Sequence, residues 1–303
     1  MKLACRLGTR GSALARAQTR LVADRLEAEG WDVEIVRIRT NGDRVRRDRS
    51  LPLARGAFVK ELEAALLDGR IDLAVHSAKD MPTEETPGVV VAALPPRGDA
   101  RDAVVTRDRT GLGSLRKGAR VGTESPRRRA FLLSERPDLE VVGIRGNVDT
   151  RLSRLDEGRY EALVLALAGL ERLGLAGRVG EILDPERMVP AVGQGALAVQ
   201  ARADDPLAAA IAFLDHAPTR RAVLAERAFL TAMGGGCRAP FAAHARLEEG
   251  ELVARGAALE PEGREVLRHT VRGPAEDAAL LGRRLAREML DRGAAALAGE
   301  DGP

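Results

Sequence analysis

The sequence has few cysteines, few aromatic residues and no long apolar run. Its 2 cysteines lie far apart among 303 residues and do not suggest a disulfide. Aromatic residues make up 2% of the chain, which leaves few side chains on which nucleic-acid bases could stack. The longest apolar runs, such as residues 162–170, are far shorter than a membrane span. The sequence therefore argues against nucleic acid and membrane as partners.

Residues 1–6 also lack the long apolar stretch of a signal peptide. Apolar residues make up 45% of the chain, which is typical of a globular protein. A length of 303 residues is too great for one ordinary core. We therefore expect a cytoplasmic protein with two or three domains.

Predicted strands alternate with predicted helices through most of the chain. Strands are expected at 3–7, 33–39, 71–75, 120–122, 140–144 and 162–166. Apolar residues at helical spacing lie between them, and this alternation is typical of βαβ units in an α/β fold with a parallel sheet. Stretches 95–98 and 189–193 contain proline and glycine and indicate hinges, so the chain is expected to cross back into its first domain at the second.

Two helices are predicted at 206–214 and 219–233. Past residues 234–237 the pattern changes to α+β, with a hairpin around Glu249 and Gly250, a strand at 266–271 and a long helix at 275–297. We therefore expect three domains, with boundaries 1–96 plus 193–214, 97–192, and 215–303.

Basic residues recur where predicted strands end and helices begin. Such positions bind anions in open α/β sheets, because the free N–H groups and the dipole of a helix N-terminus face them. The four segments are 10–12, 79–80, 123–129 and 145–151. For any one of these segments, the alternative interpretation is an ordinary surface arginine. A GC-rich or thermophilic genome is the alternative explanation for much of the total number of arginines in the chain. Their recurrence at one topological position favours a cleft for a substrate with several carboxylates.

The third segment gives the strongest argument for an anion. Ser125 suits a helix N-cap and Pro126 the first helical position. Arginines in the first turn oppose the helix dipole, so a helix selected only for stability would carry acids there. An anionic ligand is the better explanation.

An aspartate, a histidine and two cysteines are further candidates for a catalytic role. Asp80 is a catalytic acid, a helix N-cap or a salt-bridge partner of Lys79, and the residues leave these alternatives open. His76 precedes it in a buried strand, and a hydrogen-bonded core histidine is the favoured interpretation. Cys5 lies in an apolar strand and is expected to be inert. Cys237 follows three glycines on an accessible loop and is equally consistent with a nucleophile and with no function. The histidines and cysteines show no metal-ligand spacing.

Six motifs, taken together and in order, resemble hydroxymethylbilane synthase, the porphobilinogen deaminase family. They are residues 8–12, 58–63, 75–82, 145–152, 191–195 and 234–240. The resemblance runs from about residue 4 to near the C-terminus. It implies two α/β domains with mixed sheets, similar to type II periplasmic binding proteins, plus a small α+β C-terminal domain that bears the cofactor.

The resemblance implies a transferase of tetrapyrrole (porphyrin and haem) biosynthesis. Such an enzyme joins four porphobilinogen molecules head to tail, releases ammonia and yields hydroxymethylbilane. It works on a covalently bound dipyrromethane primer, whose attachment site maps onto Cys237. The resemblance also favours a cytoplasmic monomer whose partner is the small-molecule substrate.

The resemblance extends to individual site residues. It implies that Asp80 is catalytic, assisting ammonia loss, stabilising the cationic azafulvene and removing the ring proton after coupling. The cofactor-binding set is Cys237, Lys79, Asp80, Thr123, Ser125, Arg127, Arg128, Gly146 and Arg151. The substrate-binding set is Arg10, Ser12, Arg127, Arg145, Arg151 and Gln194. No metal site is expected.

Three positions depart from the family's common pattern. Glu124 replaces a small residue, Pro126 a leucine, and Arg55, in a predicted mobile loop at 44–55, a lysine.

Two other functions account for part of the sequence. A non-catalytic binding protein of the periplasmic type for a small polyanion explains the hinges and the arginines but gives Asp80 and Cys237 no role. A nucleic-acid binder that uses residues 127–129 would show a steep salt dependence of its affinity.

Overall fold

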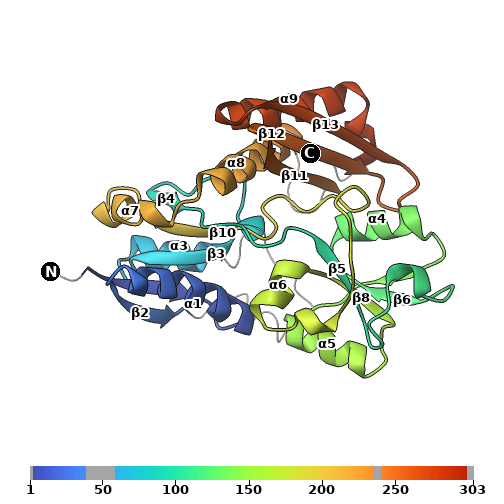
Figure 1. Cartoon of the computed structure of the whole chain (residues 1–303), viewed down its shortest axis with the longest axis horizontal. Coiled ribbons are helices and arrows are strands. Elements are labelled where there is room, and N and C mark those ends of the chain that lie inside the picture. The colour runs from blue at the N-terminus through green and yellow to red at the C-terminus, as the bar shows by residue number, and fades with distance from the viewer. Residues whose placement is uncertain (1–2, 39–58, 235–239, 299–303) are drawn as a thin grey trace. The chain divides into compact units, whose positions relative to one another are not determined.

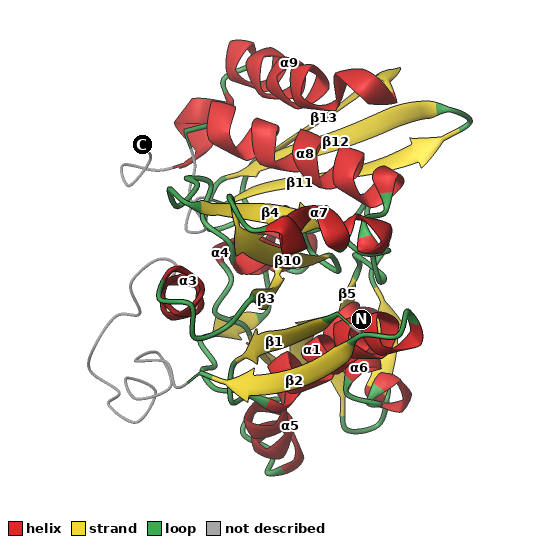
Figure 2. Cartoon of the chain, turned by 90° about the vertical axis from the view of Figure 1, so that its left-hand side faces the viewer, coloured by secondary structure: helices red, strands yellow, loops and turns green. Residues whose placement is uncertain are grey.

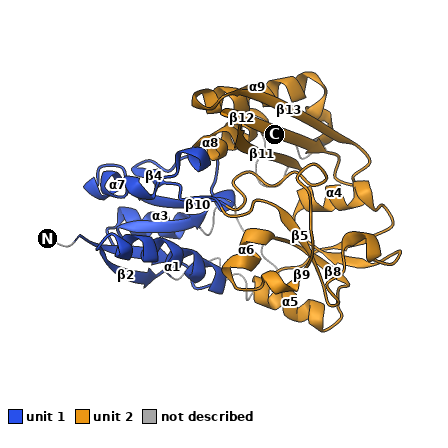
Figure 3. Ribbon diagram, in the orientation of Figure 1, with its two compact units in different colours: residues 1–97, 196–220 blue, residues 98–195, 221–303 orange. Residues whose placement is uncertain are grey.

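The computed structural model describes residues 3–38, 59–234 and 240–298, and its chain divides into two units (Figure 1, Figure 3). Unit 1 comprises residues 1–97 and 196–220, and unit 2 comprises 98–195 and 221–303. The crossovers at 97/98 and 195/196 fall beside the two expected hinges. The expected three-domain division stays a prediction.

Unit 1 is built on a mixed five-stranded sheet of order β2-β1-β3-β10-β4. Its strands are β1 (Ala4–Thr9), β2 (Asp32–Arg37), β3 (Leu73–Ser77), β4 (Val89–Ala93) and β10 (Leu197–Arg202). Strands β1, β2 and β3 run parallel, whereas β10 is antiparallel to both of its neighbours. Its helices are α1 (Ala13–Ala28), α3 (Lys60–Leu67), α7 (Pro206–Ala210) and the short 3-10 turns η1 (Ala78–Asp80) and η4 (Ala212–Leu214).

The core of unit 1 forms where the apolar face of α1 meets the sheet. Leu7, Val22 and Leu26 are at most 1% exposed. Trp31 is 7% exposed and belongs to the same cluster, with its ring centroid 6.5 Å from that of Phe213. Val22 and Leu26 of the apolar stripe seen in the sequence therefore lie on the buried face of α1, whereas Leu21 of the same stripe is 47% exposed.

Unit 2 contains a second mixed sheet, of order β7-β6-β8-β5-β9. Its strands are β5 (Asp102–Thr106), β6 (Arg120–Gly122), β7 (Glu140–Val142), β8 (Ala162–Ala166) and β9 (Val179–Ile182). Here β5 is the antiparallel strand in fourth place. Its helices are α4 (Pro126–Glu135), α5 (Val148–Asp156), α6 (Leu167–Arg172) and the 3-10 turns η2 (Leu112–Ser114) and η3 (Ala176–Arg178).

The C-terminal part of unit 2 is a three-stranded antiparallel sheet, β11-β12-β13, with two helices packed against it (Figure 2). Its elements are α8 (Ala217–Ala232, whose first four residues belong to unit 1), β11 (Phe241–Glu248), β12 (Glu251–Leu259), β13 (Val266–Pro274), η5 (Ala275–Asp277), α9 (Ala278–Asp291) and η6 (Ala294–Ala298). Phe229 of α8 and Leu285 and Met289 of α9 are fully buried in its core.

The expected fold class, α/β with two mixed sheets and a small α+β part, is confirmed. The parallel sheet inferred from strand alternation alone is wrong in one respect, since each sheet contains an antiparallel fourth strand. The single helix predicted at 275–297 is divided between a 3-10 turn, α9 and a second 3-10 turn. The helix predicted at 206–214 is likewise α7 followed by a 3-10 turn.

Candidate functional site

In unit 1, two groups of predicted site residues follow neighbouring parallel strands. Arg10 comes directly after β1, and Lys79 and Asp80 lie in the 3-10 turn that follows β3. Because the carboxyl ends of parallel neighbours meet at one edge of the sheet, the fold brings these side chains to the same edge. Ser12 caps α1 there, and its Oγ accepts a hydrogen bond from the backbone N–H of Ala15 at 3.2 Å.

Asp80 is exposed and Lys79 is partly buried. Asp80 is the last residue of its 3-10 turn, whose N-cap is Ser77, so helix capping does not explain it. An exposed carboxylate that follows Lys79, at the sheet edge to which Arg10 also belongs, is accessible to an incoming ligand. The geometry is compatible with the expected catalytic role.

His76 lies in the core, as expected, with 5% of its surface exposed. Burial lowers the pKa of its imidazole to about 4. The side chain is therefore neutral near pH 7.

The two cysteines differ in what the structure says of them. Cys5 is 4% exposed, and burial, followed by the negative charge of Asp72, raises the pKa of its thiol to about 11. This agrees with the expected inert role, because the thiolate is the reactive form. Cys237, like Arg55, lies outside the described residues.

In unit 2, the segment after β6 folds as its sequence predicts. Ser125 is the N-cap of α4, Pro126 occupies the first turn, and the Ser125 Oγ accepts from the N–H of Arg128 at 3.4 Å. Thr123 is 5% exposed, and its Oγ1 accepts from the N–H of Ser125 at 3.2 Å. The two hydroxyl side chains thus shape the turn into the helix.

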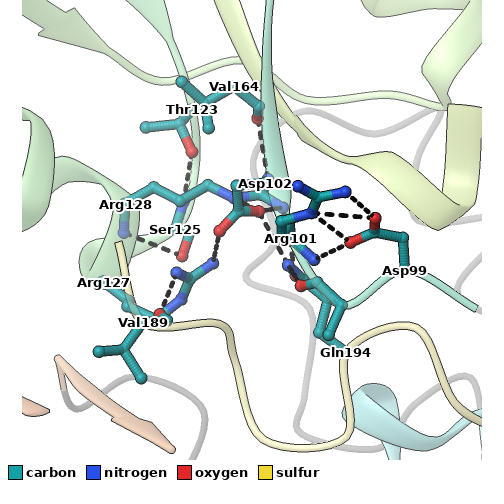
Figure 4. A network of polar contacts seen from close by, with 11 residues as sticks. Asp99, Arg101, Asp102, Thr123, Ser125, Arg127, Arg128, Val164, Val189 and Gln194 are labelled. Atoms are coloured by element: carbon teal, nitrogen blue, oxygen red, sulfur yellow. Dashed lines mark hydrogen bonds and ion pairs between the residues drawn. The ribbon is translucent and has the colours of Figure 1, made fainter. Parts of the chain in front are cut away.

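The first-turn arginines of α4 point into the protein and share one carboxylate, that of Asp102 (Figure 4). Arg127 donates from Nη2 to Asp102 Oδ2 at 2.7 Å and from Nη1 to the carbonyl of Val189 at 2.7 Å. Arg128 approaches Oδ1 with Nη2 at 2.7 Å and Nε at 3.0 Å, and donates from Nη1 to the carbonyl of Val164 at 2.9 Å. Both arginines are therefore held at two edges of the guanidinium plane.

The second crossover segment contributes Gln194, which is 1% exposed. Its Nε2 donates to the carbonyl of Ala100 at 2.7 Å and to Asp102 Oδ1 at 3.0 Å, and its Oε1 accepts from Arg128 Nη2 at 3.4 Å. Gly195 follows with φ +84°, and a Cβ there would lie 2.6 Å from the Gly98 carbonyl oxygen, which explains the glycine. The fold thus unites Thr123, Ser125, Arg127, Arg128 and Gln194.

The charge of this cluster is unbalanced. Burial alone would raise the pKa of Asp102, but the charges of Arg127 and Arg128 outweigh it and hold that pKa at about 2. Two guanidinium groups thus face one carboxylate, and these three side chains are at most 9% exposed. Arg127 Nε is buried without a hydrogen-bond partner among the described residues. A ligand with carboxylates fits, since it would supply the missing negative charge and the missing acceptor.

The fourth segment follows β7, the parallel neighbour of β6. Gly146 has φ +116°, and its carbonyl accepts from Arg151 Nε at 2.9 Å. The Arg145 side chain is 62% exposed, and its Nε lies 3.8 Å from Glu124 Oε1. Glu124, which departs from the family's common pattern, therefore places a carboxylate near Arg145, one of the residues predicted to bind the anionic ligand.

Asp102 is the residue that the sequence interpretation missed. It opens an apolar strand and is 0% exposed. A single acid at the start of a strand is common in sequences, so the signal was weak. The buried arginines were expected at the surface of a cleft, and only the fold reveals their shared partner.

Two family models cover almost the whole chain. Residues 5–210 match "Porphobilinogen deaminase, dipyromethane cofactor binding domain", and residues 220–291 match "Porphobilinogen deaminase, C-terminal domain". The chain belongs to the porphobilinogen deaminase family. This confirms the resemblance stated above and the expected enzyme class, a transferase of tetrapyrrole biosynthesis.

Curated relatives of the porphobilinogen deaminase family extend over nearly the same length. The porphobilinogen deaminase of Roseiflexus sp. (strain RS-1) is 49% identical over 302 residues, covering 98% of this chain and 99% of the relative. That of Pelobacter propionicus is 47% identical over 299 residues, covering 96% and 95%.

Solved structures similar to this family member include a putative methionine-binding lipoprotein from Bacillus subtilis. It is 12% identical, covers 70% of this chain and 89% of its own, and has a TM-score of 0.43. Within the described residues, no helix is both long and apolar enough to span a membrane, and no group of three or more potential metal ligands occurs.

Proposed function

We propose that this chain is a hydroxymethylbilane synthase, which joins four porphobilinogen molecules head to tail and releases ammonia. The observation that carries the proposal is the buried cluster of two arginines against one carboxylate at the start of α4. Each pyrrole of the substrate carries an acetate and a propionate. A growing chain of such rings supplies the carboxylates that this cluster lacks.

Dipyrromethane is the proposed cofactor, tethered through a thioether to Cys237. When bound, it supplies the primer ring to which substrate is added. The residues proposed to hold it are Lys79, Asp80, Thr123, Ser125, Arg127, Arg128, Gly146 and Arg151. The buried pair Arg127 and Arg128 supports this assignment, because guanidinium groups bind carboxylates with two parallel hydrogen bonds.

Asp80 performs the acid–base work in this proposal. Its carboxylate stabilises the positive charge that develops on the substrate as ammonia leaves, and it accepts the ring proton released after coupling. Its exposed position at a sheet edge, next to Lys79, supports the assignment.

The porphobilinogen carboxylates are proposed to contact Arg10, Ser12, Arg127, Arg145, Arg151 and Gln194. The exposed side chain of Arg145 and the cap position of Ser12 support contacts with a mobile ligand. A helix N-terminus such as that of α1 also attracts anions through its dipole.

Intact-mass measurement of the purified chain tests the proposal. We expect the wild-type mass to exceed that of the polypeptide by two pyrrole units, and Cys237→Ser to have the mass of the bare chain. An unmodified wild-type mass with no consumption of porphobilinogen would overturn the proposed function.

Asp80→Asn provides the second arm. We expect it to retain the added mass of the wild type but to lose nearly all turnover, because general acid–base catalysis contributes roughly 10²–10⁴-fold. Turnover close to wild type would remove Asp80 from the proposed chemistry.

A monomeric state and a cytoplasmic location complete the proposal. Light scattering of the holoenzyme should give the mass of one chain. A dimer mass at micromolar concentration would contradict this part alone.

A further inference from the structure

One carboxylate organises the ligand-binding arginines of unit 2. All ion pairs that Arg127 and Arg128 form among the described residues go to Asp102, one to each oxygen. Asp102 is 0% exposed, so the solvent offers it no other hydrogen-bond donor. The two oxygens therefore act as a fixed pair of acceptors between two cations.

Local helix geometry would not hold the arginines in this way by itself. Arg127 and Arg128 are adjacent in the first turn of α4, where like charges repel each other and the helix dipole repels both. Exposed arginine side chains would turn to solvent. Asp102 on β5 reverses this preference, because its charge draws both guanidinium groups inward until they reach the carbonyls of Val189 and Val164.

The same carboxylate also fixes an amide. Gln194 Nε2 donates to Asp102 Oδ1, which orients the side chain so that its Oε1 faces Arg128. Gln194 belongs to the second crossover segment and Asp102 to the strand that follows the first. One carboxylate thus determines the directions of three side chains that the proposed function assigns to ligand binding.

We propose that Asp102 is a positioning residue for the cofactor and substrate carboxylates. It sets the orientation of Arg127, Arg128 and Gln194 and leaves the cluster with one uncompensated positive charge for the ligand. It takes no part in the bond-forming step. This inference rests on the proposed function and deepens it, since it concerns the same site.

Asp102→Asn tests the inference, because asparagine keeps the shape but offers one acceptor where two are needed. The readouts are the fraction of chains that carry the added mass and the KM and kcat for porphobilinogen, both at a low temperature where circular dichroism shows a folded chain. We expect the loaded fraction to fall and KM to rise roughly ten- to hundredfold, as for loss of a charge-assisted hydrogen bond. The change in kcat of loaded chains should be smaller than the change in KM.

Asp99→Asn is the matched control. Asp99 lies three residues earlier and also pairs with an arginine, Arg101, but both side chains are partly exposed, at 23% and 42%. We expect the loaded fraction and the KM of the Asp99→Asn variant to stay within twofold of wild type.

Asp102→Glu keeps the charge but displaces the oxygens by one methylene. It provides the test if the asparagine variant does not fold, and it too should raise KM.

The outcomes distinguish failure of this inference from failure of the proposed function. If wild type is loaded and active while folded Asp102 variants load fully with an unchanged KM, Asp102 is only a structural residue and the inference is overturned. If wild type itself carries no added mass and consumes no porphobilinogen, the proposed function fails instead.

Discussion

The two five-stranded sheets share one topology but bury different chemistry on their fourth strand. In unit 1 that strand is β10, and its Gln200 donates to Glu63 Oε1 at 2.9 Å, while Thr86 donates to Glu63 Oε2 at 2.8 Å. In unit 2 it is β5, and its Asp102 lies between two guanidinium groups. Both strands run antiparallel to their neighbours.

The fold and the binding chemistry are therefore separable. Gln200 and Thr86 are neutral donors to the buried carboxylate of Glu63, and among the described residues this carboxylate forms no ion pair. In unit 2 the cations outnumber the carboxylate. The same arrangement of strands therefore holds a buried carboxylate among neutral donors in one unit and between two cations in the other.

The largest expected effect comes from breaking the charged cluster of unit 2. Arg128→Met leaves Asp102 with one cation fewer in a site without solvent. We expect the free energy of unfolding to fall by about 3–5 kcal/mol, measured by urea denaturation. Arg129→Met is the control, because Arg129 pairs with Glu262 where both side chains are partly exposed, and its loss should be within about 0.5 kcal/mol. Equal losses of unfolding free energy in the two variants would mean that the buried ion pair contributes no more to stability than the exposed one.

The stability of unit 1 should be more sensitive to mild acid than that of unit 2. His76 has a folded pKa of about 4 against an ordinary value of 6.5, so the unfolded chain binds the proton first. Stability is unaffected above pH 6.5 and should fall by about 3 kcal/mol as pH drops from 6.5 to 4. His76→Gln should remove this part of the pH dependence of unfolding. A variant with the wild-type slope would contradict the buried neutral state.

The sequence predicts those features of the fold that depend on residues close together in the chain. The pattern of apolar residues predicts β6 and β8 to the residue, and Ser125 is predicted as the cap of α4 because capping depends on its nearest neighbours. Strands β4, β5 and β9 are not predicted from the sequence, since each is specified by pairing with strands far along the chain.

The site shows the same limit. Residues whose position follows from strand ends, such as Arg10 and Asp80, were predicted to lie at a sheet edge, and they do. The burial of Arg127 could not be predicted, because its partner Asp102 is 25 residues away and carries no pattern of its own. The fold, not the local sequence, decides which charges meet.

Stronger acid should act on unit 2 through Asp102. Its pKa in the folded chain is about 2, below the ordinary 3.8, so its contribution is complete above about pH 4 and is lost as pH falls toward 2. The expected loss is about 2 kcal/mol. The difference in unfolding free energy between wild type and Asp102→Asn should shrink over this range. A difference that stays constant from pH 4 to 2 would contradict the depressed pKa.

The smallest effect on stability is expected at Arg145, the exposed counterpart of the buried pair. Its side chain is 62% exposed and 3.8 Å from Glu124, a distance at which surface pairs contribute little. Arg145→Ala should change the unfolding free energy by less than about 0.5 kcal/mol while raising KM for porphobilinogen. A large loss of stability with unchanged KM would assign Arg145 to the fold instead of the ligand.

The chain has a single tryptophan, and its location has a practical consequence. Trp31 is buried in the core of unit 1 beside Phe213. Its fluorescence therefore reports the loss of packing in unit 1 alone, whereas far-ultraviolet circular dichroism reports helices and strands in both units. Superimposable denaturation curves from the two signals would mean that the units unfold as one cooperative system, and separated curves would assign each transition to its unit without any added label.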